Sequence, residues 1–309
     1  MNTLQNQEAV IALNHVSRRY GQKLALDDVS IEVPRGIVLG LVGANGAGKT
    51  TLIKHALGLL RAQQGTVRVF GLDPVARPVE VLGRLGYLSE DRDLPPWMTV
   101  SELMRYSRAF YAGWDPAYAE RLRQQFNLAG NSRIQTLSKG ELAKAGLLVA
   151  LAHRPELLIL DEPSSGLDPI VRRELLEAVV RSVADEGRTV LFSSHLLDEI
   201  SRVSDQVAMV VQGRIVLHGP LHQVLEAHHR MIVRLVKPAA DLHRLPGSVS
   251  ASGGPEEWTV ICNGAVEKFR QALRQAGGEV LEESGATFEE IFHARAEQRA
   301  GTVAGNLQS

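Results

Sequence analysis

Residues 43–51 read Gly43-Ala44-Asn45-Gly46-Ala47-Gly48-Lys49-Thr50-Thr51. Glycines allow backbone angles that side chains forbid, so several N–H groups can converge on one anion at the start of a helix. In such a loop the lysine reaches the β- and γ-phosphates of a nucleotide, and the threonine after it offers its hydroxyl to Mg²⁺. The candidate nucleotide-binding residues are Gly43, Asn45, Gly46, Gly48, Lys49, Thr50 and Thr51, and Thr50 is also a candidate metal ligand.

The segments on both sides of this loop distinguish a phosphate-binding loop from an accidental glycine-rich turn. Residues 37–42, Ile-Val-Leu-Gly-Leu-Val, predict a buried strand, and residues 51–60 predict a helix. Because the motif needs a strand before it and a helix after it, this context favours nucleotide binding.

Composition excludes several classes of protein. With 309 residues the chain can bury the core of one large domain or two ordinary ones. A single cysteine, Cys262, rules out an internal disulfide framework. The net charge of −1, from 34 basic and 35 acidic residues, provides no long-range attraction to nucleic acid or anionic lipid. The sequence has neither a signal peptide nor an apolar run of about 18 residues, so we expect a chain that is not secreted and does not span a membrane by itself.

An aromatic residue precedes the loop. Residues 8–15 and 29–33 alternate apolar and polar side chains and predict two antiparallel strands, with Tyr20 between them. An aromatic ring at a strand edge can stack on an adenine, although an ordinary half-buried strand tyrosine is the alternative. With the phosphate loop downstream, stacking is the favoured interpretation.

Acidic residues follow two predicted strands. Residues 157–160 are four apolar residues that end at Asp161 and Glu162. Ligands bind at the carboxyl edge of open α/β sheets, so Asp161 suits a Mg²⁺ shell and Glu162 suits orienting water. Glu90 follows the strand expected at residues 84–88. It is either a Mg²⁺ ligand or an exposed loop residue, and the sequence leaves both open.

Residues 97–152 predict a helical insertion, because apolar and aromatic residues recur at helical spacing. Within it, Ser138 and Glu141 form the pattern of a capping box at the start of a long helix. A helix start that carries Ser138 and Gly140 can also bind phosphate, so the two interpretations stand side by side.

Two polar residues follow the acidic pair. Asp168 caps the helix that Pro169 begins. His195 stands at the carboxyl end of the strand predicted from residue 189, where it can donate to a γ-phosphate, although a lone histidine is usually an ordinary polar residue.

The pattern restarts after residue 220. Residues 221–298 predict a small α+β domain, linked through the Ser/Gly-rich residues 247–254, that packs or dimerises without chemistry of its own. Residues 299–309 are expected to form a flexible tail.

The order and spacing of these motifs over residues 8–220 resemble the ATP-binding-cassette subunits of ABC transporters. By resemblance residues 43–50 are the Walker A loop, Asp161 is the Walker B acid, Glu162 the catalytic carboxylate, His195 the switch histidine and Tyr20 the adenine-stacking aromatic. Residues 137–141 correspond to the signature motif, and Asp168 ends a further family motif. The implied fold is α/β: a P-loop NTPase core, residues 1–220, with an antiparallel β-subdomain and the helical insertion, followed by the small C-terminal domain.

The resemblance also implies cofactors and partners. ATP and Mg²⁺ are the expected cofactors, and a transmembrane permease subunit is the expected partner, which places the chain in the cytoplasm on the inner face of the membrane. In the family two cassettes pack head to tail, so that the signature of one covers ATP held by the other. We therefore expect a homodimeric, Mg²⁺-dependent ATPase whose cargo is determined by the permease.

Three residues depart from the usual family pattern. The signature Leu-Ser-Gly-Gly-Gln has Lys139 in its third position and Glu141 in its fifth, and Glu90 stands where glutamine is usual. With the C-terminal appendage, these features look like bacterial subunits that export drugs, lipids or polysaccharides. The alternative is a soluble cassette ATPase acting on ribosomes or DNA. One Walker A loop, no sustained heptads and no basic surplus count against it.

Overall fold

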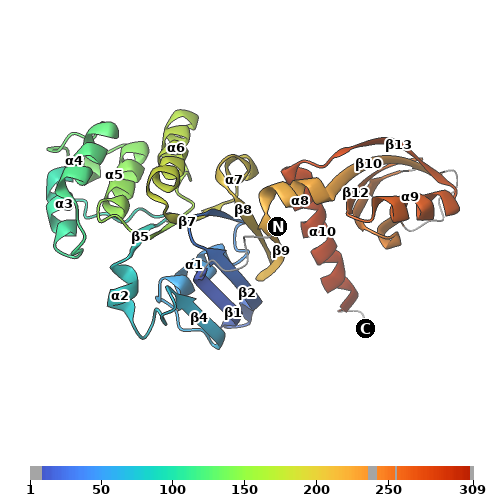
Figure 1. The fold of residues 1–309 in the computed structure, drawn as a ribbon, viewed down its shortest axis with the longest axis horizontal. Coiled ribbons are helices and arrows are strands. Elements are labelled where there is room, and N and C mark those ends of the chain that lie inside the picture. The colour runs from blue at the N-terminus through green and yellow to red at the C-terminus, as the bar shows by residue number, and fades with distance from the viewer. Residues whose placement is uncertain (1–8, 236–241, 255, 307–309) are drawn as a thin grey trace. The chain divides into compact units, whose positions relative to one another are not determined.

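The computed structural model describes residues 9–235, 242–254 and 256–306 (Figure 1). The chain forms two compact units, residues 1–215 and 216–309. The observed division lies slightly before the expected boundary between residues 220 and 221. Among the described residues, no helix combines the length and the apolar character needed to cross a membrane.

The first unit is built on a six-stranded sheet with the order β5-β6-β7-β3-β8-β9. Its strands are β3 (Val38–Val42), β5 (Leu85–Leu88), β6 (Leu157–Asp161), β7 (Thr189–Ser194), β8 (Gln206–Val211) and β9 (Arg214–Pro220). The neighbours from β5 to β8 are parallel, and every residue of β3, β6 and β7 is buried. Parallel strands have their carboxyl ends at one edge, so the loops after β3, β5, β6 and β7 emerge together there.

A second sheet of three antiparallel strands has the order β2-β1-β4. Its strands are β1 (Ala9–Tyr20), β2 (Lys23–Pro34) and β4 (Gln64–Val69). Helix α1 (Lys49–Ala56) contacts β2 and β4 of this sheet and β6 of the parallel sheet, and its Leu52 and Ile53 are buried in a core shared with both. The helix that follows the phosphate loop is therefore fixed from two sides.

Helices complete the first unit. Helix α2 (Pro78–Leu82) precedes β5, and α6 (Pro169–Glu186) and α7 (Leu197–Val203) follow β6 and β7. The segment 97–152 contains α3 (Val100–Arg108), α4 (Pro116–Gln125), the short 3₁₀ helix η1 (Ile134–Thr136) and α5 (Lys139–Leu151) (Figure 1). Side chains cap three of these helices: Thr99 caps α3, Asp115 caps α4 and Ser138 caps α5. Each cap satisfies an N–H group that the helix leaves unpaired.

The second unit is an α+β fold with a four-stranded antiparallel sheet of order β11-β12-β10-β13. Its elements are α8 (Leu221–Ala227), β10 (His228–Leu235), the 3₁₀ helix η2 (Leu242–Arg244), β11 (Ser248–Gly253), β12 (Glu257–Asn263), α9 (Val266–Gln275), β13 (Gly278–Gly285) and α10 (Phe288–Asn306). A small core around Phe269 and Met231 holds them together.

Two expectations for the second unit are corrected. Residues 247–254, expected as a linker, contain the edge strand β11, which pairs with β12 and buries Val249 and Ala251. Pairing with a neighbouring strand outweighs the low strand propensity of serine and glycine. Helix α10 extends to residue 306 across most of the expected tail, and residues 307–309 lie outside the described residues.

Candidate nucleotide site

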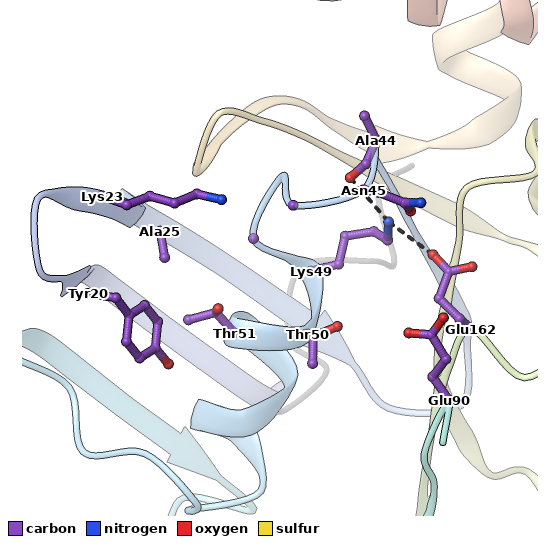
Figure 2. A pocket seen from close by; sticks show the side chains of 12 residues that line it. Tyr20, Lys23, Ala25, Ala44, Asn45, Lys49, Thr50, Thr51, Glu90 and Glu162 are labelled. Carbon is purple, nitrogen blue, oxygen red and sulfur yellow. Dashed lines mark hydrogen bonds and ion pairs between the residues drawn. The ribbon is translucent and has the colours of Figure 1, made fainter. Parts of the chain in front are cut away.

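A cavity of about 380 Å³ lies at the phosphate loop (Figure 2). It brings together nine of the predicted site residues: Tyr20, Asn45, Gly46, Gly48, Lys49, Thr50, Thr51, Glu90 and Glu162. Figure 2 shows Tyr20 and Lys23 at one end and Glu90 and Glu162 at the other, with Thr50 and Thr51 between them. The cavity therefore has an aromatic end and an acidic end, separated by the loop.

Glycine is required in the loop by close contacts with the backbone. Gly48 has φ +117°, and a Cβ atom there would lie 2.5 Å from the carbonyl oxygen of Ala25. A Cβ atom on Gly43 would lie 2.5 Å from the carbonyl oxygen of Val210. Within the described chain, α1 has no side-chain cap at Gly48 and no acid in its first turn. Its first N–H groups and its dipole are thus directed at the cavity, as anion binding requires.

Lys49 is held at the floor of the cavity. Its Nζ donates to the carbonyl oxygens of Gly43 at 2.7 Å and Ala44 at 3.4 Å, and it lies 3.0 Å from Oε1 of Glu162. The side chains of Lys49 and Glu162 are only 5% and 6% exposed. A buried charge needs partners, and these contacts supply them while directing the ammonium group toward the loop.

The acidic pair is organised by Ser193 on β7. Its hydroxyl donates to Oδ1 of Asp161 at 2.7 Å and accepts the N–H of Glu162 at 2.9 Å. Burial raises the pKa of Asp161, whereas hydrogen bonds from Ser193 and Thr50 act in the opposite direction. Nothing in the sequence singled out Ser193. Its role is evident only from the structure, because the register of β6 and β7 pairs Ser193 with Asp161.

The oxygen-rich end of the cavity fits Mg²⁺. Asp161 and the Thr50 hydroxyl are hydrogen-bonded, and Thr50 and Glu90 both line the cavity, whereas Asp161 does not. The pKa of Tyr87 is raised to about 12, first by burial and then by the negative charges of Asp161, Asp91 and Glu90. In the described parts of the chain, no group of three or more His, Cys, Asp or Glu side chains is arranged to hold a metal ion. Mg²⁺ is usually bound by one or two carboxylates together with substrate phosphates, and Asp161, Glu90 and the Thr50 hydroxyl supply oxygens of that kind.

His195 contacts Glu162 directly. Its Nδ1 lies 2.7 Å from Oε2 of Glu162, and its backbone N–H donates to the same oxygen at 3.3 Å. Glu162 has φ +47°, a backbone conformation that is uncommon for residues other than glycine and that recurs at functional sites. The acidic residue after β6 and the histidine after β7 thus form one unit, although His195 does not line the cavity.

Six predicted site residues do not line the cavity of their own chain, namely Gly43, Asp161, His195, Ser138, Gly140 and Asp168. Ser138 and Glu141 form the capping box of α5, so the cap is present whether or not Ser138 also binds phosphate. Gly140 faces Val171, and Asp168 accepts the N–H groups of Ile170 and Val171 at the start of α6.

Lys23 and Ala25 of β2 line the cavity but were missed in the sequence. The signal was available, because the two-residue turn after Tyr20 pairs Tyr20 with Lys23 across β1 and β2. Tyr20 is 44% exposed, and the guanidinium carbon of Arg18 lies 4.9 Å from its ring centroid. An aromatic ring and a lysine therefore stand together at one end of the cavity.

Comparisons with known proteins agree with this geometry. Residues 26–165 match the family model described as ABC transporter. The chain is 34% identical over 229 residues to the ABC transporter ATP-binding protein NatA of Bacillus subtilis, covering 71% of this chain and 92% of NatA. It is 35% identical over 217 residues to the daunorubicin resistance ATP-binding protein DrrA3 of Streptomyces coeruleorubidus, covering 69% and 68%.

A solved structure described as the ATP-binding subunit of an ABC transporter superimposes with a TM-score of 0.65 at 30% identity, covering 70% of this chain and 92% of that one. The family-model match, residues 26–165, contains the phosphate loop, the helical insertion and the acidic pair. The predicted α/β fold and the predicted ATPase activity are both confirmed. This chain belongs to the ABC transporter family, as one of its ATP-binding subunits.

Proposed function

We propose that this chain is the ATP-hydrolysing subunit of an exporter whose membrane-spanning part is a separate permease. The observation that carries the proposal is that Glu162, which lines the cavity at the phosphate loop, contacts both Lys49 and His195. A cassette with these three side chains in contact is equipped for turnover as well as for binding. This chain would then provide the free energy of ATP hydrolysis, and the permease would provide the route of the cargo through the membrane.

The residues divide the work of hydrolysis between them. Lys49 and the N–H groups at the start of α1 bind the phosphates, while Tyr20 stacks on the adenine. Glu162 orients the attacking water and accepts its proton, and His195 donates toward the γ-phosphate. Thr50, Asp161 and Glu90 would hold Mg²⁺, which when bound neutralises charge on the phosphate oxygens.

We propose that two copies act as a head-to-tail homodimer. Ser138 and Gly140 lie at the start of α5, and neither lines the cavity of its own chain. A helix start of this kind is suited to phosphate, so its nucleotide would come from the second copy. Closure on ATP and reopening after hydrolysis would then move the helical insertion of residues 97–152.

Binding to the permease would place this chain at the cytoplasmic face of the membrane. No described helix could itself span a bilayer, so the spanning segments would come from a partner. Export of a drug, lipid or polysaccharide is the direction and cargo class we propose. DrrA3, which is named for daunorubicin resistance, supports this assignment.

Co-purification tests the proposal. The Glu162→Gln variant, tagged and expressed in its native host, would be extracted from membranes with mild detergent in the presence of ATP and Mg²⁺. We expect an integral membrane protein to be retained with it, and vesicles holding both proteins to accumulate cargo only with ATP and the wild-type chain. Recovery with ribosomes or DNA from the soluble fraction would instead support the non-transport alternative.

A further inference from the structure

The carboxylate of Glu199 is buried outside the nucleotide cavity. It lies in the first turn of α7 and is only 1% exposed, whereas its neighbour Asp198 is exposed. Burying an ionised carboxylate is costly unless donors surround it, so the partners of Glu199 show which segments it holds.

Two hydroxyl groups and one guanidinium group, from three different segments, converge on Glu199. Its Oε2 accepts the hydroxyls of Ser164 at 2.7 Å and Ser194 at 2.8 Å, and its Oε1 lies 3.2 Å from Nε of Arg172. Ser164 lies in the loop after β6, Ser194 ends β7 and Arg172 belongs to α6. One carboxylate therefore joins the loop after β6, the last residue of β7 and helices α6 and α7 in the interior.

The two serines lie beside the reacting residues. Ser164 is two residues after Glu162, and Ser194 directly precedes His195. The Ser194 hydroxyl also accepts the N–H of Leu196 at 3.0 Å, so the chain is anchored on both sides of His195. The loop that contains Ser164 is held from its other side by Arg92, whose Nη2 donates to the carbonyl oxygens of Pro163 at 2.9 Å and Ser165 at 2.7 Å.

We infer that Glu199 is a positioning residue that sets the relative placement of Glu162 and His195. The inference rests on the proposed roles of those two residues. Their side chains meet at 2.7 Å although they follow different strands, and Glu199 is bonded to Ser164, in the loop that contains Glu162, and to Ser194, directly before His195. Reacting groups must be held within fractions of an ångström, and supporting hydrogen bonds provide that constraint.

A purely structural role predicts something different. If Glu199 only stabilises the packing of α7, its loss would lower the melting temperature and leave turnover per folded molecule unchanged. If it positions the pair, turnover would fall while nucleotide affinity stays the same, because neither Glu199 nor the serines line the cavity.

The test uses Glu199→Gln, Ser164→Ala and Ser194→Ala in the full chain. The amide in Glu199→Gln removes the negative charge that faces Arg172 and can place an N–H donor against the serine hydroxyls, and each alanine removes one hydroxyl. The matched controls are Asp198→Asn and Ser201→Ala, since Asp198 and Ser201 are exposed on the same helix and the Ser201 hydroxyl contacts only the backbone of Leu197. Affinity for a fluorescent ATP analogue, steady-state kcat and melting temperature are measured for each protein.

We expect kcat to fall roughly 10- to 100-fold in Glu199→Gln and less in each serine variant, with unchanged affinity and with normal controls. If both serine variants keep the wild-type kcat per folded molecule, the inference is wrong. This holds even if their melting temperatures are lower, and it does not require that Glu199→Gln folds. A parallel loss of affinity would also overturn it. Glu162→Gln is assayed alongside: if that variant turns over normally, the proposed role of Glu162 is wrong, whereas an inactive Glu162→Gln beside normal serine variants refutes only the inference about Glu199.

Discussion

The Nζ atom of Lys49, at the first position of α1, lies 3.0 Å from Oε1 of Glu162, directly after β6, and both side chains are almost completely buried. The group proposed to bind phosphate and the group proposed to orient water therefore contact each other within one chain. Removing either leaves the other buried without its opposite charge, which is destabilising. Variants at these positions must be shown to be folded before their activity is interpreted.

Lys49→Ala is expected to abolish ATP binding. Removal of the ammonium group leaves the phosphate charge facing backbone dipoles alone, and a charge-assisted contact is lost. Equilibrium titration with a fluorescent ATP analogue measures the effect. Lys54→Ala is the matched control, because Lys54 is exposed on the same helix and does not line the cavity. Unchanged affinity in Lys49→Ala would sink the assignment of this loop.

Glu162→Gln is expected to bind ATP but to hydrolyse it roughly 100-fold more slowly, because a positioned general base is lost while the side chain keeps its shape. ATP should then trap a stable dimer, which light scattering detects. The wild-type chain with ATP is the comparison, since it should cycle between dimer and monomer. A Glu162→Gln protein that stays monomeric and turns over normally would contradict the proposed role.

Ser138→Arg is expected to block closure of the dimer while the isolated chain keeps its nucleotide affinity. The capping box alone predicts only a loss of about 1 kcal/mol in the free energy of unfolding. Thr99→Arg is a matched control, because Thr99 caps α3 with the same reciprocal bonds to Glu102 that join Ser138 to Glu141. Only the Ser138 variant should lose ATP-driven dimerisation.

A mixing experiment tests whether the sites are shared. Combining Ser138→Arg with Lys49→Ala gives a heterodimer in which one site has both halves mutated and the other has both halves intact. Sharing predicts that ATPase activity partly recovers above that of either parent alone. If heterodimers form and no activity returns, Ser138 acts as a helix cap and nothing more.

Glu156 makes stability depend on pH at the opposite edge of the sheet. Its carboxylate accepts from Nε of Arg84 at 2.6 Å and from Nη1 of Arg35 at 2.7 Å, and these hydrogen bonds, from Arg84 first, lower its pKa to about 2. The side chain is 39% exposed, so solvent screens the pairs, and we expect Glu156→Gln to lower the free energy of unfolding by only about 1 kcal/mol at neutral pH.

The pH dependence follows from the direction of this shift. A carboxylate whose pKa is lower in the folded chain stabilises the fold above its unfolded pKa, and the contribution is lost as pH falls through the folded pKa. The difference between wild type and Glu156→Gln should be full above the ordinary value of 4.5 and shrink toward zero near pH 2. Urea unfolding at several pH values measures it, with Glu32→Gln, an exposed strand residue, as the control. A difference independent of pH would contradict the role of the charge.

The local motifs of this protein could be interpreted from the sequence, because each depends on backbone angles and neighbours close in the chain. The glycines of residues 43–48 are required where φ is positive or another backbone approaches closely, and the acids after β6 follow a run that is apolar because the strand is buried on both faces. The capping box of Ser138 and Glu141 was likewise visible in the sequence, since it spans only four consecutive positions.

Contacts between distant segments were decided only by the tertiary structure, because they depend on strand order and register. The order β6-β7-β3 places Glu162 beside His195 and Lys49, and the register of β6 and β7 puts Ser193 against Asp161. Residues 248–253 form a strand only because β12 supplies hydrogen-bond partners that serine and glycine propensities do not reveal. The donors around Glu199 come from three elements that meet only when the sheet is assembled, so no short stretch of sequence could show that its carboxylate is buried and paired.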